Sequence, residues 1–413
     1  MTDARASGAL LALLVVLAGC STVGPERTTQ SPSQTEPEVT VAGDLPFDAE
    51  TVYRRVADLH GIPYASLPDV TVEVKDQADL DVSDLTSVTR FQRTMGFDPE
   101  TPDTALAGLA RPGRVSLFTD PVDTHEQLEQ VLAHEFAHIV QFDQDAYDEV
   151  DDAIRGSGGN ETRLQTAATE GAASYVAEQY AVEYLDADPG LRPWAEVRAN
   201  RSQFGAYVVA PYHFGQRYVQ QRVDSPADLP AVYDDPPRSS EQLISGDDAD
   251  RPKQLFVRFD GLDRPVADRR TKGELFVRLM LEGQLDGDRA ATAAAGWGRD
   301  RLLPLDDGDG TRSYVWALRW DTPEDADEFE AAMRDFLDGH AGAPGDGPWR
   351  DGETAYQVQR AGEETVVVFV GDPAFVTNVS ATAGGGEVTV SADSETLVTA
   401  SDARTVPRRP VRP

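Results

Sequence analysis

The residues best suited to chemistry lie in one short segment, His134-Glu135-Phe136-Ala137-His138. Histidines four positions apart share one face of a helix, so His134 and His138 can bind the same metal ion while Glu135 lies beside them. In a chain of 413 residues with 6 His and 72 acidic residues, only about 0.015 such matches are expected by chance. The segment therefore predicts a Zn²⁺ site on a helix.

This zinc helix is expected over 124–141, with Thr124 as its N-cap and Gln127 completing a capping box. Glu135 would act as the general base, taking a proton from zinc-bound water and later delivering it to the leaving amine. The alternative for Glu135 is an ordinary surface glutamate on an acidic helix.

A catalytic zinc ion needs three protein ligands and one open position. Glu161, Glu170 and Glu178 are the candidates for the third ligand, around a second predicted helix over 162–185. Glu170 is preferred because the small residues 171–173 after it would let its helix approach the zinc helix closely. A solvated glutamate is the alternative.

The two helical segments resemble the peptidase MA-like branch of the gluzincins. The second helix of that family carries a Glu-Gly-x-Ala-x-Tyr signature, which this chain matches at Glu170, Gly171, Ala173 and Tyr175. Pro211-Tyr-x-x-Gly215 is similar to the short motif that follows, and 237–242 and 296–301 resemble features of surface relatives with a C-terminal domain. The resemblance covers about 110–370 and implies His134, His138 and Glu170 as zinc ligands and peptides as substrates.

The resemblance also implies a Tyr or His donor downstream that binds the developing oxyanion. Tyr212 and His213 are adjacent candidates, and neighbouring helical residues cannot both face the zinc ion. Tyr212 is preferred because it matches the family's tyrosine position. The alternative is that Tyr212 packs in the core and His213 is solvated.

The N-terminus has the pattern of an export signal. Residues 9–18 are an apolar run too short to span a membrane, and Leu17-Ala-Gly-Cys20 resembles a lipobox. We expect Cys20, the only cysteine, to carry a lipid that anchors the protein to the extracellular face of the membrane. An ordinary cleaved signal or an uncleaved anchor is the alternative.

The charge is strongly acidic, with a net value of −35 at pH 7. Such a surface repels phosphate and excludes a general nucleic-acid binder. Lysine occurs only at 75, 253 and 272, and the acidic residues are spread along the whole chain. This composition suits a protein that stays soluble at very high salt, and with the lipobox it resembles a surface lipoprotein of the haloarchaeal type.

The fold class expected is α+β: a mainly helical gluzincin-like catalytic domain with a small edge sheet, and a smaller α+β C-terminal domain. The proposed divisions are a signal peptide at 1–20, a disordered tether at 21–45, the peptidase domain at 46–250, the C-terminal domain at 251–383 and a polar tail at 384–413.

Several local expectations accompany these divisions. The strand predicted at 114–119 could be an edge along which an extended peptide aligns, or a plain structural strand. Loops are predicted at 143–160 and 224–252, and a third helix is expected to start near Pro211. A hairpin turn is expected at 307–310.

The function predicted is that of an extracellular, lipid-anchored zinc metallopeptidase. A non-catalytic surface or envelope binding protein, with a structural or vestigial zinc site, is the alternative. The intact Glu135 argues for the enzyme, because a structural zinc site has no need of it. Neither the substrate specificity nor the oligomeric state follows from the sequence.

Overall fold

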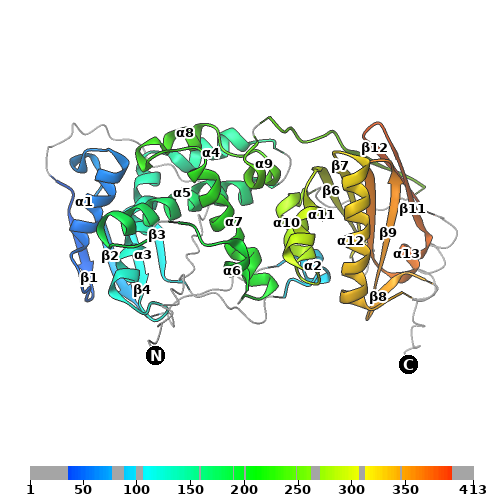
Figure 1. Cartoon of the computed structure of the whole chain (residues 1–413), viewed down its shortest axis with the longest axis horizontal. Coiled ribbons are helices and arrows are strands. Elements are labelled where there is room, and N and C mark those ends of the chain that lie inside the picture. Colours follow the sequence, from blue (N-terminus) through cyan, green and yellow to red (C-terminus); the bar gives the residue numbers. More distant parts are fainter. Residues whose placement is uncertain are drawn as a thin grey trace, which may run out of the picture. The chain divides into compact units, whose positions relative to one another are not determined.

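The computed structural model forms two compact units (Figure 1). The N-terminal unit comprises residues within 1–88, 99–155 and 161–238, and the C-terminal unit those within 89–98, 156–160 and 239–413. The structure describes residues 36–76, 88–98, 106–157, 160–188, 190–199, 201–247, 249–261, 270–306, 312–344 and 347–392. The mixed α+β fold class is confirmed.

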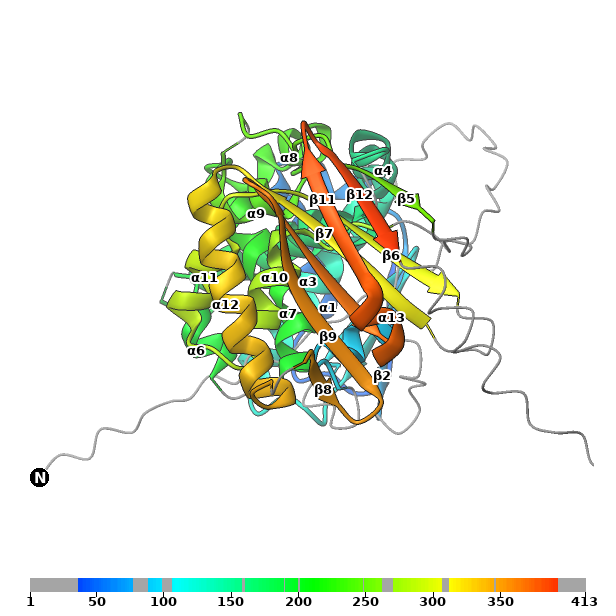
Figure 2. The same ribbon diagram turned by 90° about the vertical axis from the view of Figure 1, so that its right-hand side faces the viewer.

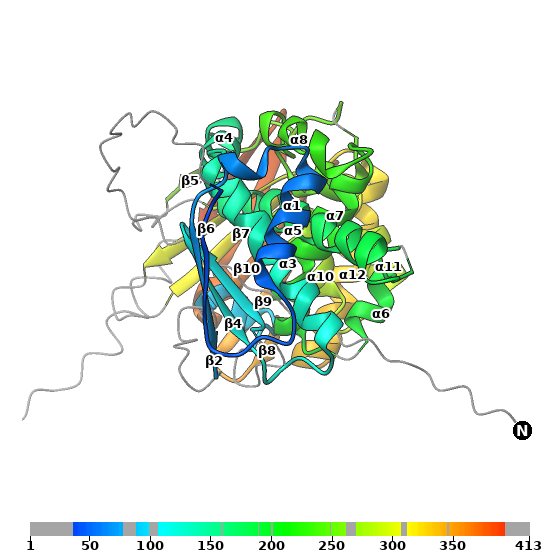
Figure 3. The same cartoon turned by 90° about the vertical axis from the view of Figure 1, so that its left-hand side faces the viewer.

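The N-terminal unit contains one four-stranded sheet, in the order β1 (Val39–Ala42), β2 (Val70–Lys75), β4 (Arg114–Phe118), β3 (Gly108–Arg111). The first three strands run parallel, and β3 pairs antiparallel with β4. Figure 3 shows this unit from the side of α1, with β2 and β4 labelled. β3 is therefore an edge strand, and it runs against α3.

Helices make up the rest of this unit. They are α1 (Ala49–His60), α3 (His125–Asp143), α4 (Ala146–Ile154), α5 (Glu161–Tyr184), α6 (Trp194–Arg198), α7 (Gln203–Gln220) and α8 (Pro230–Asp234), with 3₁₀ turns η1 at Tyr64–Ser66 and η3 at Pro226–Asp228. The alanine-rich α5 is central, because it packs against both α3 and α7.

The C-terminal unit is built on an antiparallel five-stranded sheet, in the order β6 (Trp297–Asp306), β7 (Arg312–Trp320), β10 (Thr365–Gly371), β9 (Thr354–Gly362), β8 (Trp349–Asp351). A three-stranded sheet of β11 (Val379–Gly384), β12 (Glu387–Ala392) and β5 (Phe256–Asp260) packs on one face, where Val315, Phe369 and Val390 share a buried apolar core. The long helix α12 (Pro323–Ala341) lies along the strands of the larger sheet (Figure 2).

Shorter helices complete the C-terminal unit. They are α2 (Arg90–Thr94), α9 (Ser240–Ser245), α10 (Gly273–Leu281), α11 (Gly287–Ala294) and α13 (Pro373–Asn378). Phe91 of α2 packs against Trp316 of β7, at 5.5 Å between ring centroids, which explains why 89–98 belongs to this unit. The junction after the N-terminal unit falls at 238/239 instead of 250/251, because Ser240 Oγ accepts a hydrogen bond from the Leu275 amide of α10.

Two segments expected to lack structure contain strands. β1 lies within the predicted tether; three of its four side chains are exposed, so backbone pairing with β2 holds it and composition could not reveal it. β12 lies within the predicted polar tail, and Val388 and Val390 alternate into the core.

The predicted loops also contain helices. α4 falls within 143–160, where Ala146, Val150 and Ile154 form a buried stripe inside an acidic sequence. α8 and α9 fall within 224–252. Cys20 and residues 307–310 lie outside the described residues.

The third helix, α7, begins at Gln203, eight residues before Pro211. Proline inside a helix removes one backbone hydrogen bond and leaves the carbonyl four residues earlier without its usual donor. That carbonyl belongs to Tyr207, and it accepts a hydrogen bond from Arg163 Nη1 at 2.9 Å. The helix therefore continues through Pro211 because α5 supplies the missing donor.

Candidate metal centre

α3 is buried over eleven consecutive residues, 131–141. Thr124 caps it by accepting a hydrogen bond from the Gln127 backbone amide. The return bond of the predicted capping box differs, because Gln127 Oε1 accepts from the backbone amide of Asp123 and not from that of Thr124. A helix buried on all sides has no solvated face for polar groups. The polar side chains in this stretch must therefore find partners inside the protein.

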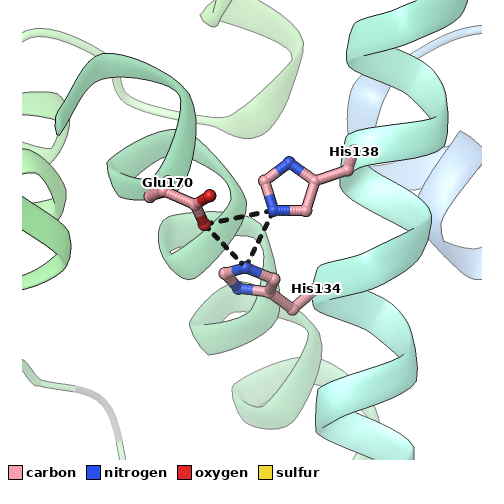
Figure 4. Close-up of side chains that lie close together, drawn as sticks. All are labelled: His134, His138 and Glu170. Atoms are coloured by element: carbon pink, nitrogen blue, oxygen red, sulfur yellow. Dashed lines mark hydrogen bonds and ion pairs between the residues drawn. The ribbon is translucent and has the colours of Figure 1, made fainter. Parts of the chain in front are cut away.

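The three predicted ligands each bring one side-chain atom to the same place. His134 Nε2 and His138 Nε2 lie 3.0 Å apart, and Glu170 Oε2 lies 3.3 Å from the first and 3.2 Å from the second. Figure 4 shows both imidazoles reaching from one helix towards the carboxylate on the other. The three residues are 1%, 0% and 2% exposed, respectively.

This arrangement fits a zinc ion. Two ligands of a tetrahedral Zn²⁺, each about 2.0–2.1 Å from the metal, lie about 3.3–3.4 Å apart. The three measured separations, 3.0–3.3 Å, are close to that value. Two imidazoles and one carboxylate are also a donor set that leaves a fourth position open in catalytic zinc sites.

Two of the three residues have the protonation state that binds metal. Burial lowers the pKa of His134 to about 4. Burial acts in the same direction on His138, but the Glu170 carboxylate outweighs it and raises that pKa to about 9. Burial opposes ionisation of Glu170, yet the two histidines hold its pKa below the usual value. At neutral pH Glu170 is thus an anion and His134 a neutral imidazole, the forms that ligate metals, whereas His138 carries a proton that a metal ion must displace.

Glu135 has a different environment. It is fully buried, and neither carboxylate oxygen has a hydrogen-bond partner within the described part of the chain. Burial raises its pKa to about 8, although the charge of His138 acts to lower it. A Cβ on Gly108 of β3 would come within 2.4 Å of Glu135 Oε1. The carboxylate therefore occupies a space beside β3 that exists only because residue 108 has no side chain.

The approach of α5 differs from the expectation in one respect. Gly171 does not face α3, because a Cβ there would lie 2.2 Å from the backbone of Gly215 in α7. A Cβ on Gly215 would lie 2.0 Å from the carbonyl oxygen of Ala167. Adjacent helical positions point about 100° apart, so Glu170 faces the histidines while Gly171 accommodates α7. The Gly215 motif is accordingly a helix-packing feature.

Tyr212 and His213 both lie on α7, and each is 8% exposed. His213 packs among aromatic rings, 5.2 Å from Trp194 and 5.1 Å from Phe214 between centroids. His213 is not part of the described group of converging ligand atoms, and the alternative in which it is solvated is wrong because the ring is buried. The oxyanion role of Tyr212 stays a prediction.

The residues behind His138 were not predicted from the sequence. Its Nδ1 lies 2.7 Å from Gln141 Oε1 and 3.0 Å from the Tyr147 hydroxyl. Gln141 in turn donates to the Thr169 carbonyl and to the Tyr233 hydroxyl, at 2.8 Å and 3.1 Å. The signal for Gln141 was its position three residues after His138, which puts both on one helix face.

A second acidic group lies in the C-terminal unit, where Glu241, Asp250 and Asp321 offer ligand atoms within 4.8 Å of one another. Burial raises the pKa of Glu241 to about 10, so it holds a proton at neutral pH. The Lys253 ammonium lies 3.6 Å from Asp321 Oδ1. Because a proton and an ammonium already compensate these charges, we assign no metal to this group.

Comparison with known proteins identifies only part of the C-terminal unit. Residues 263–380 match the model of a family described as a domain of unknown function (DUF8575). The matched segment does not include the histidine–glutamate cluster. No curated protein and no solved structure matches the chain. Among the described helices, none is long and apolar enough to cross a membrane.

Proposed function

We propose that the protein is a zinc-dependent peptidase. The observation that carries the proposal is the convergence of His134, His138 and Glu170 beside the buried, unpartnered carboxylate of Glu135. An unpaired buried carboxylate costs stability, and such groups concentrate at functional sites. A purely structural metal site would not require this unpaired carboxylate.

Zinc, when bound here, would polarise the scissile carbonyl and acidify a water molecule. Glu135 takes up the proton of the attacking water on its carboxylate and transfers it to the leaving nitrogen. The raised pKa of Glu135 suits a residue that must hold this proton briefly at neutral pH. Cation charge at the site would move that pKa back towards the ionised form needed for the first transfer.

The substrate-aligning strand that we propose is β3. The strand predicted for this role, β4, lies between β2 and β3 and is not an edge. β3 pairs with β4 along one side, and its Gly108 and Ala110 lie next to Glu135. A peptide added to the other side of β3 as a further strand would pass beside the base. Backbone pairing of this kind selects extended peptides with little dependence on side chains.

The proposed location is the extracellular face of the membrane, with a lipid on Cys20. This inference rests on the N-terminal sequence pattern alone.

The decisive experiment compares the full chain with its Glu135→Gln variant, in hydrolysis of an unstructured protein at high salt. We expect Glu135→Gln to lower kcat by about 10²–10⁴-fold, the usual contribution of a general base. Zinc affinity should be unchanged, because Glu135 is not a ligand. Glu126→Gln is the matched control, since it removes the same charge from an exposed position on α3 and should leave kcat as it is.

Zinc binding without cleavage by the wild-type chain, across several unstructured substrates, would instead support a non-catalytic surface protein. Failure to bind zinc at all would overturn the assignment of the three ligands.

A further inference from the structure

His138 has two ring nitrogens with different surroundings. Nε2 points towards Glu170 and His134, at 3.2 Å and 3.0 Å, and is the nitrogen that would ligate the metal. Nδ1 lies on the other side of the ring, 2.7 Å from Gln141 Oε1. As a metal ligand the imidazole is neutral and carries one proton, so the partner of Nδ1 decides whether Nε2 has a free lone pair.

The orientation of the Gln141 amide is settled by its other neighbours. Its nitrogen lies 2.8 Å from the Thr169 carbonyl oxygen, which can only accept a hydrogen bond. The side-chain nitrogen must therefore face Thr169, and it also donates to the Tyr233 hydroxyl at 3.1 Å. The remaining atom, Oε1, then faces His138 and can only accept.

Tyr147 offers a competing arrangement, because its hydroxyl lies 3.0 Å from the same Nδ1 and could donate to it. That arrangement would leave the Nδ1 lone pair facing Gln141 Oε1 at 2.7 Å, two acceptors in repulsive contact. A proton on Nδ1 removes the conflict, since Gln141 then accepts the shorter hydrogen bond and Tyr147 a longer one. The contacts thus favour the tautomer with its proton on Nδ1.

We propose that Gln141 is a positioning residue for the metal centre. It holds His138 with the Nε2 lone pair directed at the site, and its bond to Thr169 links this ligand to the residue next to Glu170. One side chain thereby orients a ligand on α3 relative to a ligand on α5. The inference rests on the proposed metal site and deepens it, because Gln141 itself touches no metal.

The burial of the group makes this arrangement specific. Gln141 is 1% exposed and His138 is fully buried, so water cannot replace a lost partner. Residues that hydrogen-bond to metal-ligating histidines typically contribute about 10–100-fold to metal affinity.

The test is zinc affinity of the full chain, measured by competition with a chromogenic chelator, for wild type, Gln141→Met and Gln141→Glu. Gln141→Met keeps the volume but offers no acceptor, and we expect its affinity to fall by about 10–100-fold. Gln141→Glu keeps an acceptor oxygen facing His138, and its second oxygen must carry a proton in order to donate to the Thr169 carbonyl as the amide nitrogen does. In that protonated form its zinc affinity should stay within about 3-fold of wild type. The visible absorption of the Co²⁺-loaded protein should change in the Met variant and not in the Glu variant.

Tyr233→Phe is the matched control, because it removes one buried partner of Gln141 while the Thr169 carbonyl still fixes the amide. Its zinc affinity should stay within about 3-fold of wild type. A merely structural role for Gln141 would lower the thermal midpoint of the metal-free protein without changing zinc affinity. Unchanged affinity in Gln141→Met would therefore overturn the inference while leaving the peptidase proposal intact.

If Gln141→Met does not fold, long-range ¹⁵N–¹H NMR of the zinc-loaded wild-type chain decides the matter. A proton on Nδ1 of His138 is expected, and zinc bound through Nδ1 would refute the tautomer assignment. A wild-type chain that binds no zinc overturns the proposed function and, with it, this inference. The two failures are therefore distinguishable.

Discussion

At the scale of single residues, the metal centre is a set of polar groups inside an apolar helix. An unpaired polar group in such a place costs about 1–3 kcal/mol, more when charged. The histidines and Glu170 reduce this cost by contacting one another, and Gln141 is the hydrogen-bond partner of His138 Nδ1. Among these residues only Glu135 has no hydrogen-bond partner for its carboxylate, so its burial remains unfavourable. This is the physical reason to treat it as the reactive group.

Gly108→Ala tests the space that holds Glu135. The added methyl would lie 2.4–2.7 Å from three atoms of the Glu135 side chain, so the carboxylate must move. A displacement near 1 Å can lower the rate by about 100-fold. We expect a loss of that order in kcat on an unstructured protein, with zinc affinity preserved because the ligands are untouched.

Gly287→Ala is the control for this substitution, because a Cβ at that position meets nothing within 4 Å. Full activity in Gly108→Ala would show that Glu135 can do its work from a different position, contrary to the proposed geometry.

At the scale of elements, the site depends on α5 touching two helices at once. Gly171 and Gly215 bring α5 and α7 into backbone contact, while Glu170 on the adjacent position reaches α3. α7 remains helical through Pro211 because Arg163 of α5 bonds to the Tyr207 carbonyl. The position of Glu170 is therefore determined by packing on another face of its own helix.

Gly215→Ala should destabilise the protein for this reason. A Cβ there would lie 2.0 Å from the Ala167 carbonyl oxygen, and backbone cannot move aside as a flexible side chain can. Overpacking costs about 1–3 kcal/mol, occasionally more, while the gain in helix propensity from Gly to Ala is only about 1 kcal/mol. Because the clash is with backbone, we take the upper end of the overpacking range, and subtracting the gain in helix propensity leaves a net loss of about 2 kcal/mol in the free energy of unfolding.

Denaturant unfolding followed by circular dichroism measures this loss. Gly347→Ala, where a Cβ meets nothing within 4 Å, should change the unfolding free energy by less than about 0.5 kcal/mol. A Gly215→Ala variant as stable as wild type would mean that the two helices can separate without cost.

At the scale of the whole molecule, two units of different construction share one chain. The N-terminal unit contains the candidate metal centre, and the C-terminal unit contains the segment at 263–380 that matches DUF8575. Both belong to a chain with 37 basic and 72 acidic residues, so like charges repel across the surface. Self-repulsion of this kind opposes compact folding unless salt screens it.

Stability should therefore rise with salt. The Debye length falls from about 10 Å at 0.1 M to about 3 Å at 1 M, which removes most repulsion between exposed carboxylates. We expect the thermal midpoint to increase steadily with KCl over this range, at constant zinc loading. Sucrose is the control, because it stabilises proteins by exclusion from the surface without screening charge. A midpoint that responds to sucrose but not to KCl would contradict the electrostatic explanation.

Local pattern was enough to predict much of the candidate site. The i,i+4 spacing places His134 and His138 on one face wherever that helix forms, and cap residues such as Thr124 and Thr322 mark where helices begin. The continuous apolar run of β10 and the helical spacing of α1 are likewise local signals. Spacing alone did not distinguish Glu170 from the other two glutamates; the small residues at 171–173 and then the family resemblance favoured it.

The tertiary structure decided everything that depends on residues far apart in the chain. Strand β1 exists because β2 offers it hydrogen bonds, and β3 is the edge because β4 is covered on both sides. Gly171 faces α7, and Gln141 gains its role only when Thr169 and Tyr233 reach it from other helices. Spacing along one helix determines which side chains share a face, but only packing determines what that face meets. The histidine pair was therefore evident in the sequence, and the orientation of the imidazole of His138 became evident only in the folded chain.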